Sequence, residues 1–81
     1  MRVRVLAFAR LGELLGWTRR DVMLPGPSST SDVWTLLAAQ APAIAPLAES
    51  TRIARNGRVV ITPQLLEEDD EIALLPPVSG G

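Results

Sequence analysis

The feature that most constrains the fold of this chain is its closing stretch, Glu71–Gly81. It begins with apolar side chains at Ile72 and Leu74, the alternation typical of a strand that turns one face toward a core. Pro76 and Pro77 then end the sheet, because proline has no N–H to donate and fixes its own φ. The fold must therefore hold this strand in a sheet and release the remaining residues from its end.

The residues after the prolines form a slender tip. Val78 and Ser79 lead into Gly80-Gly81, and glycine packs no side chain and costs backbone entropy to order. Last residues are usually frayed, and Gly-Gly alone indicates nothing more. A strand, a stiff Pro-Pro exit and a thin tip with a free carboxylate together indicate a functional tail.

The composition limits the chemistry that this chain can perform. With 81 residues and 47% hydrophobic content, it makes one small domain whose core must be packed efficiently. It contains no cysteine and no histidine. These absences exclude disulfides, thiolate metal sites and thiol nucleophiles, and they remove the usual general base near neutral pH. We therefore expect the catalytic groups to lie on a partner, and we expect no metal site.

The charges are distributed unevenly along the chain. All eight basic residues are arginines and precede residue 67, whereas residues 67–81 carry five acids and no base. Because lysine is absent, no side chain can accept an isopeptide bond, which excludes polymerisation in the manner of ubiquitin. The amino-terminal residues show no signal-peptide pattern, and no apolar run approaches membrane-spanning length. We expect a soluble cytoplasmic protein that does not bind a membrane.

Hydrophobic periodicity and turn signals predict the order of elements. They indicate strands at residues 2–8, 19–24, 52–55, 58–61 and 71–75, a short helix at 10–15, a main helix at 32–41, and a further short turn from Pro42 through Ala48. Asn56-Gly57 is the strongest hairpin signal in the chain, and Gly16 is a plausible end of the short helix. Leu65-Leu66 is expected to tuck under the sheet.

This order predicts an α+β fold with one layer of helix. The main helix must bury its apolar stripe against a sheet that holds both the first and the last strand. We predict the ubiquitin-like β-grasp fold, in which the two terminal strands are parallel at the centre of a mixed sheet packed against one main helix. The predicted division is a β-grasp domain at residues 1–75 and a flexible Gly-Gly tail at residues 76–81.

Several charged or aromatic residues have more than one interpretation. The acidic run at residues 67–71 lacks the spaced ligands and the glycine of a calcium loop, so a solvated turn is favoured over a cation site. An electrostatic docking patch for a basic partner is a further interpretation of that run. Arg52, Arg55 and Arg58 lack interleaved aromatic residues in an acidic chain, which argues against nucleic acid. Trp34 is interpreted as a partly buried packing residue.

Phe8 and Leu75 fall on the strand faces opposite to the core residues of their own strands. If the two strands are neighbours, these side chains form one outward apolar patch near the tail exit. Exposed aromatic residues at the centre of a patch are typical anchors of an interface. Cover by the short helix at residues 10–15 is an equally good interpretation of the sequence.

Two motifs resemble the small subunit of molybdopterin synthase. Residues 8–16 (FARLGELLG) resemble the opening of that family, and Asn56 stands where the family has an asparagine in its hairpin. Residues 70–81 (DEIALLPPVSGG) are similar to its closing motif almost residue for residue, and the resemblance spans the whole chain. Three positions depart from the family pattern, which has an arginine, an apolar residue and a glycine there: Gly12, Arg55 and Asp69.

The resemblance implies a sulfur carrier in molybdenum cofactor biosynthesis. An E1-like adenylating enzyme would use ATP to adenylate the Gly81 carboxylate, and a persulfide sulfur from a sulfurtransferase would displace AMP to leave a thiocarboxylate. The tail would then deliver sulfur inside the large subunit, converting a cyclic pyranopterin precursor to the dithiolene of molybdopterin. The resemblance implies two copies of each chain, catalytic residues on the large subunit, and no permanently bound cofactor.

The site residues that this resemblance implies lie at the end of the chain and on the predicted patch. Gly81 would carry the adenylate and then the thiocarboxylate. The partner-binding residues would be Phe8, Leu75, Pro76, Pro77, Val78, Ser79, Gly80 and Gly81.

The residue chemistry is independently consistent with a carrier. A carboxylate is a poor electrophile until it becomes a mixed anhydride, and glycine leaves the terminal carbonyl unhindered. Pro76-Pro77 limits the conformations lost on insertion into a pocket. Three alternatives stay open: a carrier for another pathway such as thiazole synthesis, a ubiquitin-like modifier whose tail joins lysines on targets, and an interaction domain with an inert tail. Fold alone does not choose among them.

Overall fold

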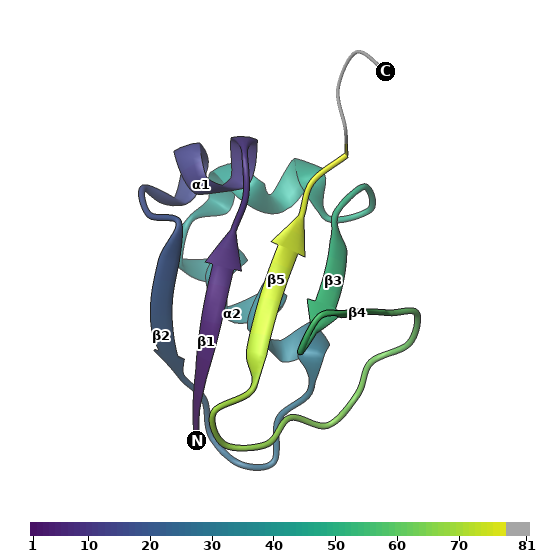
Figure 1. Ribbon diagram of the computed structural model, residues 1–81. Helices are drawn as coiled ribbons and strands as arrows, with labels where there is room; N and C mark the ends of the chain where they lie inside the picture. The colour runs from purple at the N-terminus through teal and green to yellow at the C-terminus, as the bar shows by residue number, and fades with distance from the viewer. Residues whose placement is uncertain (78–81) are drawn as a thin grey trace.

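The computed structural model of this protein describes residues 1–77 and contains one five-stranded mixed sheet with an α-helix across one face (Figure 1). The predicted tail residues Val78, Ser79, Gly80 and Gly81 lie outside the described residues. The elements in chain order are β1 (Arg2–Ala7), α1 (Arg10–Leu15), β2 (Arg19–Met23), α2 (Thr30–Gln40), the 3-10 helix η1 (Pro42–Leu47), β3 (Arg52–Arg55), β4 (Arg58–Val60) and β5 (Glu71–Leu75).

The sheet has the strand order β2-β1-β5-β3-β4. β1 and β5 are parallel neighbours at its centre, and every other pairing is antiparallel. This confirms the predicted central position of the two terminal strands. In Figure 1 β1 and β5 both run toward the end of the sheet at which α1 and η1 lie, so the chain starts at one end of the sheet and Pro76 leaves from the other. We call these the far end and the tail end.

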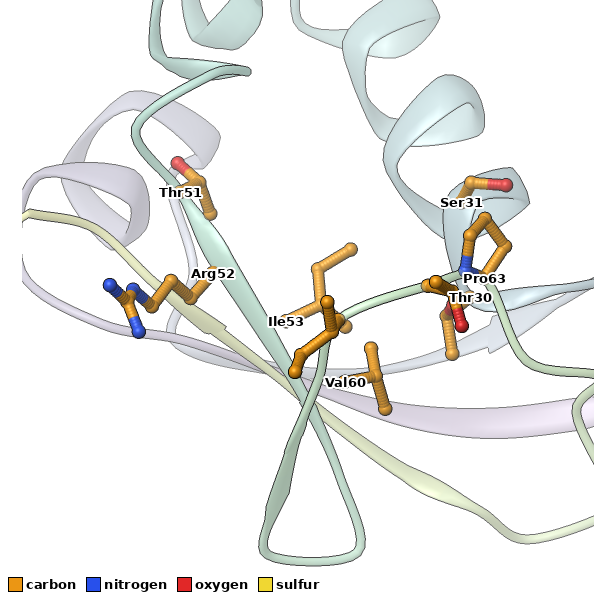
Figure 2. A pocket seen from close by; sticks show the side chains of 9 residues that line it. Thr30, Ser31, Thr51, Arg52, Ile53, Val60 and Pro63 are labelled. Carbon is orange, nitrogen blue, oxygen red and sulfur yellow. The ribbon is translucent and has the colours of Figure 1, made fainter.

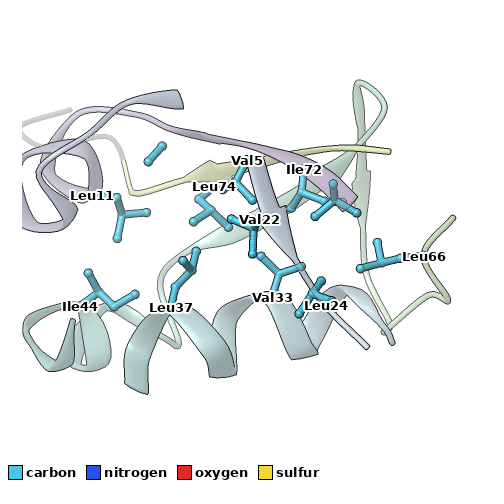
Figure 3. Close-up of a cluster of buried hydrophobic side chains, with 12 residues drawn as sticks. Val5, Leu11, Val22, Leu24, Val33, Leu37, Ile44, Leu66, Ile72 and Leu74 are labelled. Carbon is cyan, nitrogen blue, oxygen red and sulfur yellow. The ribbon is translucent and has the colours of Figure 1, made fainter. Parts of the chain in front are cut away.

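The core lies between the sheet and α2 (Figure 3). The parallel register places Val5 beside Ile72 and Ala7 beside Leu74, so the inward residues of the two central strands form one continuous surface. Fully burying a side chain such as Leu or Ile contributes roughly 1.5–3 kcal/mol relative to leaving it exposed. The buried cluster consists of Val3, Val5, Ala7, Leu11, Val22, Leu24, Val33, Leu37, Ile44, Leu66, Ile72 and Leu74.

Helix α2 begins two residues before the predicted start because Ser29 is the N-cap. The Ser29 N–H donates to Asp32 Oδ2 at 2.7 Å, and the Asp32 N–H donates to the Ser29 carbonyl oxygen at 3.0 Å. These bonds occupy backbone groups that the first helical turn would otherwise leave without partners. The helix ends at Gln40, before Pro42 opens η1, which agrees with the predicted stop and further turn.

Strand ends and one connector differ slightly from the prediction. β1, β2 and β4 each end one residue earlier than predicted, at Ala7, Met23 and Val60. Leu66 enters the core as expected, whereas Leu65 is 68% exposed, so only half of this connector tucks under the sheet. Trp34 is partly buried against the core, as predicted. In residues 1–77 there is no helix long and apolar enough to cross a membrane.

Helix α1 packs closely against the end of β1 because Gly12 has no Cβ. A Cβ at this position would lie 3.0 Å from the Ala7 carbonyl oxygen and 3.1 Å from Thr18 Cγ2. Glycine at position 12, where the resembled family has arginine, therefore allows α1 to contact the end of β1 closely. A larger residue here would push α1 away from the sheet. Gly16 ends α1 with φ 86°, the left-handed conformation expected of a glycine after a helix.

Candidate functional site

The tail leaves the domain at the carboxyl end of β5, between two surface hollows. Ala9, Arg10 and Leu47 line the first hollow together with Pro76 and Pro77. Leu75 and the two prolines also line the second hollow, with Ser50 and Arg52 on its other side. Pro76 is partly buried and Pro77 is exposed, so the chain leaves the surface within two residues. The two prolines thus restrict the backbone at the point where the chain leaves the sheet.

Phe8 and Leu75 lie side by side on the sheet face that points away from α2. The paired positions Ala7 and Leu74 precede them in the parallel ladder, and the Phe8 N–H donates to the Leu74 carbonyl oxygen at 3.4 Å. Phe8 is 47% exposed and Leu75 is partly exposed. The alternative in which α1 covers Phe8 is therefore wrong. A role of these residues in binding a partner stays a prediction.

A second row of apolar residues extends this surface across the sheet. Leu6 pairs with Ala73, Ala73 pairs with Ala54, and Ala54 pairs with Val59, which is 50% exposed. Sequence reasoning missed Ala54 and Val59, because only the registers of β3 with β5 and β4 bring them to this face. We call the combined surface the outer apolar patch; it consists of Leu6, Phe8, Val59, Ala73 and Leu75, together with Ala54, which lies between Ala73 and Val59 and is only 6% exposed.

The outer apolar patch is bordered by two arginines. Arg19 pairs with Leu6 on the β2 side, and Arg52 pairs with Leu75 on the β3 side. Both arginines are exposed. The next row on this face, one step further from the tail, is charged instead of apolar. Arg4 lies there between Asp21 and Glu71 on the neighbouring strands.

At the far end, the buried carboxylate of Asp70 is held by three donors. Arg55 Nε donates to Asp70 Oδ2 at 2.9 Å, and the Glu67 N–H donates to the same oxygen at 2.8 Å. Asn56 Nδ2 donates to Asp70 Oδ1 at 2.9 Å. Burial alone would raise the pKa of Asp70, but the bonds from Glu67, Asn56 and Arg55 outweigh it and lower this pKa below its ordinary value of 3.8. Arg55, a departure from the family pattern, thus neutralises Asp70.

The other acidic residues of this turn also hold the far end together. Asp69 has φ 67°, a left-handed conformation that aspartate tolerates, at the position where the resembled family has glycine. Its Oδ1 accepts from Arg2 Nη2 at 2.9 Å. The interpretation of residues 67–71 as a simple solvated turn is therefore wrong for Asp70, which is buried, whereas Asp69 is exposed in the turn as predicted. Among residues 1–77 no group of three or more His, Cys, Asp or Glu side chains is placed to hold a metal ion.

Asn56 joins the β3–β4 hairpin to the start of β5. Its backbone N–H donates to the Glu71 carbonyl oxygen at 2.8 Å, and its Oδ1 accepts from the Glu71 N–H at 2.9 Å. With φ 50°, Asn56 also forms the hairpin turn itself, together with Gly57 at φ 86°. The asparagine of the family motif is thus a structural residue here and lies at the opposite end of β5 from the tail.

The mixed sheet, the single main helix and the Pro-Pro exit define a class, the ubiquitin-like β-grasp proteins that end in a Gly-Gly tail. Residues 5–81 match the sequence model of the ThiS family, and the chain belongs to that family. A molybdopterin synthase sulfur carrier subunit from Drosophila yakuba is 33% identical over 84 residues, covering 100% of this chain and 92% of the relative.

Solved structures agree with this assignment of the fold. The small archaeal modifier protein 1 (SAMP1) from Haloferax volcanii superimposes with a TM-score of 0.87 at 27% identity, covering 100% of both chains. Subunits 1 and 2 of the molybdopterin-converting factor from Helicobacter pylori form a protein-protein complex. One chain of that complex superimposes with a TM-score of 0.73 at 21% identity, again over 100% of both chains. The second similarity shows the fold alone.

Proposed function

We propose that this chain is the sulfur-carrier subunit of a molybdopterin synthase. The observation that carries the proposal is the exit of the tail from the central strand β5 beside the outer apolar patch. A partner that covers Phe8 and Leu75 would receive the tail at the edge of the same contact. Similarity over the full chain to a protein named molybdopterin synthase sulfur carrier subunit supports this function.

The proposed chemistry takes place at the Gly81 carboxylate. A carboxylate oxygen attacks the α-phosphorus of ATP on an E1-like adenylating enzyme, and pyrophosphate leaves. The outer sulfur of a sulfurtransferase persulfide attacks the acyl carbon, and AMP leaves with the C–O bond electrons. A thiol then cleaves the resulting acyl disulfide, forming a disulfide with the donor cysteine and releasing the thiocarboxylate.

The chain itself acts as a covalent substrate in this scheme. It has no histidine, cysteine or lysine, so we place the catalytic residues for sulfur transfer on the large subunit. The Helicobacter pylori complex of subunits 1 and 2 supports a two-component assembly, and we propose two copies of each chain in it. The rigid Pro76-Pro77 exit and the glycine tip fit insertion into a narrow pocket, because few conformations and no side chains oppose it.

The experiment that tests this function is intact-mass analysis of the full chain. Incubation with the cognate adenylating enzyme, ATP, a persulfide donor and a thiol should add the mass of sulfur replacing one oxygen, and omission of ATP should abolish the change. The product should then convert the pyranopterin precursor with the large subunit present, whereas the chain alone should give no product. Absence of the mass change under these conditions would contradict the carrier function.

A second candidate is a protein modifier, favoured by the structural similarity to the small archaeal modifier protein 1. In that case the activated Gly81 would join lysine side chains of other proteins. The chain has no lysine, so such conjugates would carry single copies without chains built on side chains. Mass analysis of the protein in its native host distinguishes the two, because conjugates on target proteins support a modifier and a terminal thiocarboxylate supports a carrier.

A further inference from the structure

The arginines of this chain divide into those that are engaged within the domain and those that are not. Arg2, Arg10 and Arg55 each form an ion pair, with Asp69, Glu13 and Asp70 respectively. Arg20 lies over the ring of Trp17, 5.0 Å from its centroid. The remaining arginines, Arg4, Arg19, Arg52 and Arg58, have no carboxylate oxygen of residues 1–77 within ion-pair distance.

Two of these four arginines border the outer apolar patch on opposite sides. Arg19 on β2 is the cross-strand neighbour of Leu6, and Arg52 on β3 is the cross-strand neighbour of Leu75. The two rows that contain Leu6 and Phe8 carry no acidic residue on this face. The surface beside the tail exit is therefore apolar at its centre and positive at two of its borders.

The environment of Arg52 makes it available to a partner. Arg52 lines the hollow between α2 and the β3–β4 hairpin together with Ile53 and Val60, and its guanidinium group points away from these two side chains (Figure 2). It also lines the hollow at Pro76 and Pro77. A partner side chain that binds Arg52 would thus also lie close to Pro76 and Pro77, where the tail begins.

We propose that the partner surface that covers the outer apolar patch has an apolar socket bordered by carboxylates, which pair with Arg52 and Arg19. The inference rests on the proposed function, since it describes the large subunit that receives the tail. Charged groups at the border of an interface act mainly through the rate of association and its dependence on salt. The apolar centre with Phe8 supplies the slow dissociation, and the two arginines orient the approach so that the tail meets its pocket.

A protein carboxylate fits these positions better than a nucleotide or a nucleic acid. Arg19 and Arg52 lie at opposite sides of the patch, with the strands β1 and β5 between them. A single phosphate group cannot reach both, and the apolar side chains between them offer it no donor. A protein surface with two separate acidic side chains satisfies both arginines and also buries the apolar centre.

The test measures binding kinetics of the full chain and its variants to the cognate large subunit and, separately, to the adenylating enzyme. Arg52→Glu and Arg19→Glu should each lower the association rate roughly tenfold at low salt, with little change in the dissociation rate. Arg52→Lys, which keeps the charge, should stay within about twofold of the wild type. The difference should shrink at about 0.15 M salt, where the Debye length is about 8 Å.

Arg58→Glu is the matched control, because Arg58 is also exposed and without an ion pair among residues 1–77 but lies at the turn of the β3–β4 hairpin. Thermal unfolding of each variant should match that of the wild type. Equal association rates for Arg52→Glu, Arg19→Glu and Arg58→Glu with a binding wild type would overturn the acidic partner surface and leave the carrier function standing. A wild type that binds neither protein would overturn both.

Discussion

Where β5 begins, the buried carboxylate of Asp70 accepts hydrogen bonds from a guanidinium, a side-chain amide and a backbone N–H. Where β5 ends, Phe8 is 47% exposed beside Leu75, and Arg52 has no ion pair with residues 1–77. The same strand thus connects an end whose polar groups are satisfied within the domain to an end that we propose to bind a partner. In this proposal, stability and binding depend on opposite ends of one strand.

The backbone shows the same contrast. Asn56 and Asp69 have positive φ at the far end, and both residue types tolerate the left-handed region. Ala9, next to the tail exit, has φ 50° and ψ −126°, a conformation suited to glycine and costly for alanine. Strain without local compensation therefore occurs at the end that we propose to bind a partner.

Deletion of Gly81 should produce the largest effect, and only on the function of the tail end. The new terminal glycine keeps its reactivity, but its carbonyl retreats by about 3.5 Å along an extended chain. Displacement of about 1 Å already costs about 100-fold when catalysis depends on positioning. Thiocarboxylate formation should fall by more than that, with unchanged thermal unfolding and unchanged binding to the large subunit. Gly81→Ala should lose less, because it keeps the reach.

Asp70→Asn should produce the largest loss of stability and leave binding at the tail end unaffected. The substitution leaves Arg55 as a partly buried charge without its carboxylate, which should cost about 3 kcal/mol in the free energy of unfolding. Denaturant unfolding measures this. Asp69→Asn is the matched control, since the Arg2–Asp69 pair is exposed and should contribute less than about 1 kcal/mol. Equal losses for the two variants would contradict the distinction drawn between buried and exposed pairs.

Phe8→Ala should weaken binding to the large subunit by about 2 kcal/mol, roughly 30-fold in Kd, mainly through faster dissociation. Because Phe8 is 47% exposed, its removal should cost much less stability than the 3–5 kcal/mol of a buried Phe→Ala change. Met23→Ala is the control: Met23 is 68% exposed, pairs with Arg2 at the far end, and should leave Kd unchanged. A large stability loss for Phe8→Ala would place Phe8 in the core.

Lowering the pH should destabilise the far end in a defined range. The pKa of Asp70 is lower in the folded chain than its ordinary value of 3.8, so the folded state favours the ionised form. This contribution is fully present above about pH 4, and is lost as the pH falls through the folded pKa. The free energy of unfolding, measured from neutral to acidic pH, should therefore decline below pH 3.8, and this decline should be smaller in Asp70→Asn. Identical pH profiles of stability for the wild type and Asp70→Asn would show that Asp70 does not cause the decline.

Ala9→Gly should produce the smallest change, a gain in stability of about 1 kcal/mol or less. Relief of the strained backbone, worth roughly 1–3 kcal/mol, is partly offset by the greater freedom of glycine in the unfolded chain. Thermal unfolding detects this gain. A loss of stability would mean that the Ala9 side chain contributes more through contacts than its backbone conformation costs.

The sequence was sufficient for those features that depend on local alternation. The parity of β1 and β5 identified both the core residues and the outward position of Phe8, since the two-residue period of a strand fixes which face each side chain joins. The start of α2 was placed two residues late because residues 28–32 hold several N-cap residues in succession, and only the Ser29–Asp32 bonds choose among them.

The role of Asp70 could not be predicted, because its partners Arg55 and Asn56 are 15 and 14 residues away and meet it only in the folded sheet. The same holds for Ala54 and Val59, which join the outer apolar patch through strand registers that no local pattern specifies. The tail, by contrast, was recognised from its motif, which is local in the sequence.

The parallel pairing of β1 and β5 also has a mechanical consequence. A partner that grips the tail and pulls applies force along β5, while the rest of the domain resists through β1 and β3 on either side. The ladder hydrogen bonds run across the strands, so such a load shears them together instead of opening them one after another. The domain should therefore withstand traction on its tail better than a sheet whose last strand lies at an edge and peels away.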